Sequence, residues 1–324
     1  MGIFMNPHEK KKFLFYTCFA VACFAFVVLL ELLVSAPSAS VGDFPQTDPA
    51  RMRATPPVLF FLVVYFGVFF AGLWNLGVCA HRKLRGLSLF DFRARVRRLP
   101  VSAVGASQIF FFVAAFLVIL QIVTLVLVLW LEMVSMTLAV ILNFALQVGV
   151  VAVLLRSLSG EFLNVKEGAR HTKMVLRLFT ASLPLLLFAV ILNAFLVRLL
   201  PIEPSMNPAV QMVLALPEGP LLLLFIIQGV ILAPLAEELF FRVFAFKLLR
   251  RRWAFWPAAA LLSSVFAVIH RASVNILPLF VLSMVLCYLY EKTQSAFPPI
   301  LFHAVFNGFN FIMVLLVKAQ ITAG

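Results

Sequence analysis

Two adjacent carboxylates and an arginine lie inside one long apolar stretch of this chain. The stretch covers Ile231 to Phe246 and contains Glu237, Glu238 and Arg242. Each ionised side chain near the centre of a bilayer costs at least about 2.5–3.5 kcal/mol, so charges there indicate a functional site. Glu238 and Arg242 are four residues apart and can neutralise each other on one helical face. Glu237 lies about 100° round the helix from Glu238 and needs a partner from elsewhere in the chain.

Later apolar stretches contain polar groups that could be this partner. His270 ends one of them, and His303 opens another, with Asn307 one helical turn later on the same face. A carboxylate, two imidazoles and a carboxamide on three helices in lipid can meet only if those helices surround a shared polar cavity. This is the composition of a hydrolytic site.

The side-chain chemistry leaves two mechanisms open. In the first, Glu237, alone or with His270, takes a proton from a water molecule. His303 and Asn307 then donate hydrogen bonds to the oxyanion that forms. In the second, Glu237, His270 and His303 bind Zn²⁺ and leave an open position for water. Pro234 fits both mechanisms, because a proline three residues before Glu237 frees a backbone carbonyl and can kink the span.

The composition of the chain indicates a membrane protein. Of its 324 residues 64% are hydrophobic and only 12% are charged, whereas a soluble domain has about 45–50% apolar residues. Several apolar runs reach the ~20 residues that a spanning helix needs. The fold class is therefore an all-α polytopic membrane helical bundle with about nine transmembrane helices. We predict spans at residues 13–36, 58–80, 104–130, 133–155, 178–198, 220–246, 254–270, 274–290 and 296–317.

The basic residues give the orientation of these spans. With a cytoplasmic amino terminus, 20 of them fall on the inner side and five on the outer side, and Arg242 lies within the membrane. This asymmetry follows the positive-inside rule. It also explains the net charge of +13 by short basic loops next to lipid head groups, so we expect no nucleic-acid partner.

The polar groups divide the chain in two. The segments 37–57 and 201–219 are predicted to be irregular external loops, and the second, with four prolines and two glutamates, marks a boundary. We expect an accessory transmembrane region at residues 1–200, with about five spans and almost no intramembrane charge. The catalytic core is expected at residues 201–324, with about four spans.

Three short motifs in this core resemble those of a known family. They are Glu237-Glu238-x-x-x-Arg242, Phe266-x-x-x-His270 and His303-x-x-x-Asn307, in that order on the first, second and fourth of four helices. The motifs and their spacing are similar to those of the CPBP family of intramembrane proteases, which includes the CAAX prenyl endopeptidases and the Abi proteins linked to bacteriocin maturation and immunity. The resemblance covers residues 220–317. One departure is Val243, where family members often have glycine.

The resemblance implies an activity and a set of roles. It implies a membrane endopeptidase, metal-dependent or glutamate-type, that cleaves a membrane-associated peptide or protein, with CAAX-type processing near the substrate's C-terminus as one form. Glu237 and His270 would activate water. His303 and Asn307 would stabilise the oxyanion or help to hold a metal such as Zn²⁺. Glu238 and Arg242 would support the site, and Phe266 would pack against its wall. The expected location is a prokaryotic plasma membrane.

Two other functions are compatible with the same residues. A proton- or ion-coupled transporter could relay protons through Glu237 and the histidines, although the chain has no internal repeat of the kind many transporters show. A non-catalytic membrane scaffold or immunity protein could retain the same polar residues for stability.

Overall fold

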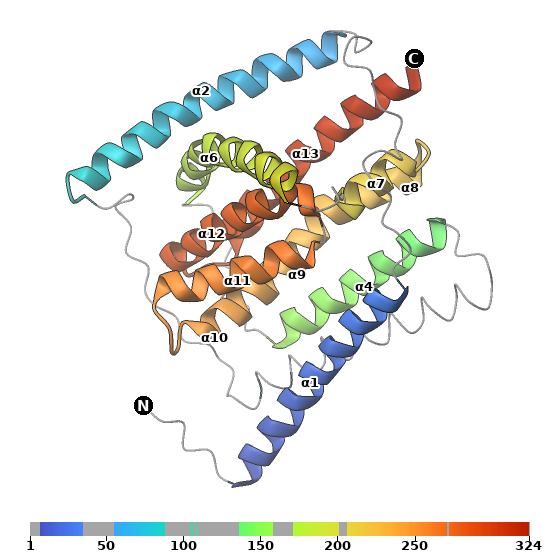
Figure 1. Cartoon of the computed structure of the whole chain (residues 1–324), viewed down its shortest axis with the longest axis vertical. Coiled ribbons are helices and arrows are strands. Elements are labelled where there is room, and N and C mark those ends of the chain that lie inside the picture. The colour runs from blue at the N-terminus through green and yellow to red at the C-terminus, as the bar shows by residue number, and fades with distance from the viewer. Residues whose placement is uncertain are drawn as a thin grey trace. The chain divides into compact units, whose positions relative to one another are not determined.

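The computed structural model describes residues 7–34, 55–87, 105, 108, 136–157, 171–200, 206–270 and 272–323. Every regular element in these residues is a helix (Figure 1), which confirms the all-α fold. The α-helices are α1 (Pro7–Val34), α2 (Pro56–Leu84), α4 (Met136–Ser157), α6 (Thr172–Leu199), α7 (Pro208–Ala215), α8 (Pro220–Ile227), α9 (Ala233–Glu238), α10 (Lys247–Leu249), α11 (Phe255–Ile269), α12 (Ile276–Thr293) and α13 (Phe297–Ala323). Two π-helical segments, η4 (Gln228–Leu232) and η5 (Leu239–Phe246), and the short 3-10 helix η6 (Ser273–Asn275) complete them.

Five of the predicted spans are confirmed as helices long and apolar enough to cross a membrane. They are Pro56–Leu84, Thr172–Leu199, Pro220–Leu249, Ser273–Thr293 and Phe297–Ile321. The spans predicted at 133–155 and 254–270 correspond to shorter apolar helices, Val140–Arg156 and Phe255–Ile269. The first predicted span lies in α1 as far as Val34, and the span predicted at 104–130 lies outside the described residues apart from two of them. The count of nine therefore stays a prediction.

The prediction of an irregular loop at 201–219 was wrong in its second half, because α7 forms there. The Asn207 side chain accepts a hydrogen bond from the Ala209 amide at 2.8 Å, and Pro208 occupies the first turn. At the other end of α7, the Lys318 ammonium group donates to the carbonyls of Val213 and Leu216. Lys318 lies within α13 and is only 6% exposed.

Close packing divides the helices into two compact units. One contains α1 and α4, and the other contains α2 and α6 to α13. In the second unit α6 packs against α2 on one side and against α12 and α13 on the other. The shared core is made of buried side chains from α6, α12 and α13: Met174, Val175, Phe179, Leu183, Leu186, Leu282, Leu286, Leu289 and Phe302. The expected functional boundary near residue 200 stays a prediction. In their packing, α2 and α6 belong to the same compact unit as the helices of the expected catalytic core.

An ion pair fixes the turn that leads into α11. Arg250 donates to both carboxylate oxygens of Glu291, with an Nη2–Oε1 distance of 2.6 Å, and its Nη1 donates to the Trp253 carbonyl at 2.6 Å. The hydrogen bond to Glu291 raises the pKa of Arg250 above its usual value. Because the turn is held in this way, α11 begins at Phe255 and has 15 residues, or about 22 Å.

The contact between α2 and α6 depends on Gly72, and this gives a first prediction. A Cβ atom at Gly72 would lie 2.3 Å from the Thr180 carbonyl oxygen, whereas a Cβ at Gly67 would meet nothing within 4 Å. Gly72→Ala should therefore lower the free energy of unfolding, measured by titration with a denaturing detergent, by about 1–3 kcal/mol. Gly67→Ala, the matched control, should be neutral or stabilising by up to about 1 kcal/mol, since alanine favours helix. Equal stability of the two variants would contradict this close approach.

Candidate functional site

The two glutamates lie on a span whose helical pitch changes twice. Within Pro220–Leu249 the π-helical segments η4 and η5 flank α9, and Glu237 and Glu238 are the last two residues of α9. At the end of η4 the Ala233 amide donates to the Gln228 carbonyl, five residues back. Such π-helical insertions occur frequently at functional sites. Pro234 is the one residue of this span that indicated an irregular helix from the sequence alone.

Pro234 explains why Asn307 bonds to the backbone of this span. In the register set by Ala233, the next amide would donate to the Gly229 carbonyl, but residue 234 is a proline and has no N–H. The Asn307 side chain donates to that carbonyl instead, at 2.9 Å. Gly229 also allows Phe311 to approach, because a Cβ there would lie 2.5 Å from the phenylalanine ring. Asn307 thus stabilises η4, which precedes the glutamates in the same span. The second hydrogen of its side-chain amide is not used in this bond.

Glu238 is the centre of a buried polar network. Its Oε1 accepts hydrogen bonds from Arg242 Nη1 at 2.9 Å and from His303 Nδ1 at 2.8 Å. The side chains of Glu238 and Arg242 are 0% exposed. A carboxylate is only an acceptor, so His303 Nδ1 is the donor of this hydrogen bond and Nε2 takes no part in it. Glu238 therefore holds the histidine as well as the arginine, which its expected supporting role did not include.

Glu237 faces the other nitrogen of the same histidine. Its Oε2 lies 3.9 Å from His303 Nε2, beyond hydrogen-bond distance, and its side chain is 28% exposed. Within the part of the chain that the structure describes, this oxygen has no hydrogen-bond partner. Oε2 is itself buried although the side chain is partly exposed, so a water molecule that donates to both acceptors would be enclosed between them. The predicted pairing of Glu237 with a group from a distant helix thus has a geometric basis.

His270 reaches this network through Phe266. Its Nδ1 donates to the Phe266 carbonyl at 2.6 Å, which leaves the lone pair on Nε2. The Phe266 ring lies 4.5 Å from the His270 ring and 5.9 Å from the His303 ring, centroid to centroid. On the same ring the Arg242 guanidinium carbon lies 4.8 Å from the centroid. Phe266 therefore packs between the charged groups and both imidazoles, as expected of a wall residue.

The expected zinc ligands fit in type but are not gathered into a metal site. Both imidazoles have Nδ1 bound to an oxygen acceptor and Nε2 available, which is the usual arrangement of a metal-binding histidine. However, no group of three His, Cys, Asp or Glu side chains within the described residues lies close enough to hold a metal ion.

Ser283 is a site residue that the sequence analysis missed. Its hydroxyl accepts a hydrogen bond from Arg242 Nη2 at 3.0 Å, and it is completely buried. It lies on α12, the core helix without a motif residue. The available signal was a serine inside an apolar span, which is too common to select one position.

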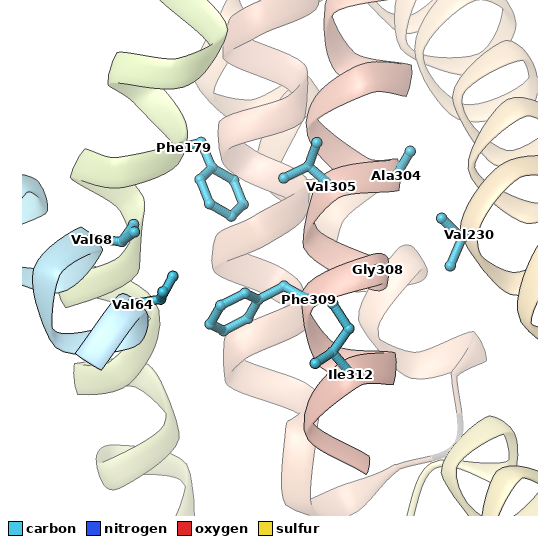
Figure 2. A pocket seen from close by; sticks show the side chains of 9 residues that line it. All are labelled: Val64, Val68, Phe179, Val230, Ala304, Val305, Gly308, Phe309 and Ile312. Carbon is cyan, nitrogen blue, oxygen red and sulfur yellow. The ribbon is translucent and has the colours of Figure 1, made fainter. Parts of the chain in front are cut away.

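An apolar groove is lined by residues of α2, α6, η4 and α13 (Figure 2). It has a volume of about 480 Å³ and is lined by Val64, Val68, Phe179, Val230, Ala304, Val305, Gly308, Phe309 and Ile312. Several of these residues are next to site residues in the chain: Ala304 follows His303, Gly308 follows Asn307, and Val230 follows Gly229. One wall of the groove is therefore built from the same helical turns that carry the polar site.

Comparison with known proteins places these residues in one domain. Residues 219–309 match the family model described as type II CAAX prenyl endopeptidase Rce1-like. This segment is an Rce1-like domain. It contains all three motifs, so the resemblance inferred from them is confirmed over this range. A protein of Bacillus subtilis (strain 168), named "Putative membrane peptidase YdiL", is 30% identical over 92 residues, which are 28% of this chain and 38% of that protein. The chain thus aligns with about two-fifths of the length of this relative, and no solved structure matches it significantly.

The buried pair in the Rce1-like domain gives a second prediction. Glu238→Gln removes the carboxylate but leaves Arg242 charged and buried, so the free energy of unfolding should fall by about 3–5 kcal/mol. The double variant Glu238→Gln/Arg242→Met leaves no lone charge and should recover most of that loss. Glu237→Gln, the isosteric control at the more exposed carboxylate, should change stability by less than about 1 kcal/mol. Additive losses in the double variant would contradict the pairing.

Proposed function

We propose that the chain is an intramembrane endopeptidase that hydrolyses a peptide bond of a membrane-associated substrate. The observation that carries the proposal is the unbonded Glu237 Oε2 at 3.9 Å from His303 Nε2, with Nδ1 of the same ring held by Glu238. The Rce1-like domain at 219–309 supports a protease. By the description of that family the substrate is of the CAAX prenyl type. The amino terminus is proposed to be cytoplasmic and the membrane to be a prokaryotic plasma membrane.

The proposed reaction starts with a water molecule between Glu237 and His303. The water donates its two hydrogens to Oε2 and Nε2, so its lone pairs face the substrate carbonyl carbon. Glu237 takes one proton as the new C–O bond forms. The proton then passes to the leaving nitrogen as the C–N bond breaks, which yields a carboxylic acid and an amine. Glu238 balances the charge on His303 whenever that ring carries a second proton, as the carboxylate of a catalytic triad does.

Asn307 and His270 have secondary roles in this scheme. Asn307 uses one amide hydrogen on the Gly229 carbonyl, and the second is available to the oxyanion that develops on the substrate. For His270 the resemblance implies water activation; its Nδ1 donates to the Phe266 carbonyl, and its ring packs on the Phe266 ring, which also contacts the His303 ring. The role of Asn307 agrees with the one that the family resemblance implies, whereas His303 here accepts a hydrogen bond from the water instead of donating one to the oxyanion.

Replacing the proposed base tests the mechanism. Glu237→Gln keeps the size of the side chain but cannot accept the proton, so kcat for a prenylated CAAX peptide reporter should fall about 10²–10⁴-fold. As a control, Glu218→Gln removes an exposed glutamate one residue before the Rce1-like segment. This variant should leave kcat unchanged. Full activity of Glu237→Gln would contradict the role of Glu237 as the base. If the wild-type protein in proteoliposomes transports ions or protons without cleaving the peptide, the transporter hypothesis replaces the protease proposal.

The apolar groove gives a further prediction about the substrate. In this proposal the groove holds the prenyl chain, since its wall is continuous with the polar site. A Cβ at Gly308 would lie 3.7 Å from Val230 Cγ1, an ordinary van der Waals distance. The Cβ of the Gly308→Leu variant should therefore fit, and the rest of the leucine side chain should fill the groove. We expect KM for a prenylated peptide to rise about 10- to 100-fold, since each excluded CH₂ is worth about 0.8 kcal/mol.

The controls separate groove filling from general damage. KM for the same peptide without the prenyl group should not change in Gly308→Leu. Gly77→Leu, at a glycine whose Cβ would meet nothing within 4 Å, should leave both KM values unchanged. Equal effects of Gly308→Leu on both peptides would show that the groove does not bind the chain.

A further inference from the structure

The Arg242 guanidinium is oriented by hydrogen bonds to two different helices. Nη1 donates to Glu238 Oε1 at 2.9 Å, and Nη2 donates to Ser283 Oγ on α12 at 3.0 Å. Phe266 and Phe241 lie against it, with the guanidinium carbon 4.8 and 5.8 Å from their ring centroids. The ring contacts restrict its position but supply no directional bond at a nitrogen. Nε has no hydrogen-bond partner among the described residues, and the Cys287 thiol of α12 also lies beside the guanidinium. The hydrogen bonds to Ser283 and Glu238 set the direction of the fork.

The direction of Arg242 matters because Glu238 shares one oxygen between two donors. Oε1 accepts from both Arg242 and His303, and Oε2 has no hydrogen-bond partner within the described residues. A rotation of the guanidinium therefore changes the position of the same atom that holds His303 Nδ1. His303 Nε2 moves with the ring, and it is the nitrogen that faces Glu237.

We infer that Ser283 is a positioning residue, whose hydroxyl orients Arg242 so that Glu238 holds His303 with Nε2 toward Glu237. This inference rests on the proposed function for its kinetic consequence, because His303 Nε2 is part of the proposed water site. Its structural content is independent of that function. In this arrangement Ser283 on α12, the core helix without a motif residue, holds Arg242 and thereby Glu238 on the neighbouring span in position.

A simpler role for Ser283 makes different predictions. If the hydroxyl only joined two helices, its removal would lower stability without changing the hydrogen bond of a histidine on α13. The test therefore needs a signal from His303 itself. A proton shared between His303 Nδ1 and a buried carboxylate should resonate far downfield in the proton NMR spectrum of the ¹⁵N-histidine-labelled full chain in detergent micelles.

The spectroscopic experiment compares three serine variants. The resonance is assigned by its loss in His303→Gln. In Ser283→Ala it should shift upfield by at least several tenths of a ppm or broaden beyond detection, and in Ser283→Thr, which keeps the hydroxyl, it should stay at the wild-type position. Ser264→Ala is the control, since the Ser264 hydroxyl is exposed and donates only to the Ala260 carbonyl of its own helix at 3.0 Å. An unchanged resonance in Ser283→Ala would overturn the inference.

The kinetic experiment uses the same variants and the prenylated reporter. Misplacement of a catalytic group by about 1 Å can cost about 10²-fold, so Ser283→Ala should lower kcat about 10- to 100-fold with KM unchanged. Ser283→Thr should restore most of the loss. A Ser283→Ala enzyme with wild-type kcat would overturn the positioning role.

The two experiments also distinguish failure of the inference from failure of the proposed function. If the wild-type chain does not cleave peptides but the His303 resonance responds to Ser283→Ala, the positioning holds and the protease proposal fails. If the wild type cleaves the reporter and neither resonance nor kcat responds, the protease proposal holds and Ser283 has no positioning role.

Discussion

The hydrogen bonds of the buried Glu238 carboxylate are the constraint on which the rest of the site depends. A charge without a partner in the interior of a bundle is strongly destabilising, so the carboxylate and the Arg242 guanidinium can be buried only if their geometry is fixed. Four elements fix it: α9 and η5 carry the pair, α13 supplies His303, and α12 supplies Ser283. Rotation of any of these helices would break the network. The packing of the core and the geometry of the site therefore depend on each other.

The sequence predicted the local part of this network and missed the part that depends on helix rotation. Glu238 and Arg242 are four residues apart on one helix, so their pairing follows from helical geometry alone. His303 is 65 residues away from Glu238, and either glutamate could have faced it. With 64% hydrophobic residues, the spans are apolar on most sides, and an apolar stripe cannot show which face turns inward. The sequence therefore singled out Glu238, Arg242 and His303 as polar residues of the core but did not predict that Glu238 would hold His303.

Other features escaped prediction because their causes lie far apart in the chain. The helix α7 is closed by Lys318, 105 residues after Val213. The π-helical turn of η4 requires the missing amide of Pro234, a glycine that admits Phe311, and the Asn307 side chain 78 residues away from Gly229. Proline indicated a freed carbonyl in this span, but only the tertiary structure could show that Gly229 carries it and that an amide from α13 satisfies it.

The two adjacent glutamates have different environments, and this difference gives them different tasks. Glu238 is fully buried and holds Arg242 and His303, whereas the Glu237 side chain is 28% exposed and its Oε2 faces His303 Nε2 without a direct hydrogen bond. Pairs of ionisable groups whose surroundings differ in this way often divide structural and chemical roles. Because the two residues are neighbours in the chain, the ion pair that fixes Glu238 also limits where Glu237 can lie. The ion pair of Glu238 thus also positions Glu237 through the backbone, while His303 bonds to Glu238 through Nδ1 and faces Glu237 through Nε2.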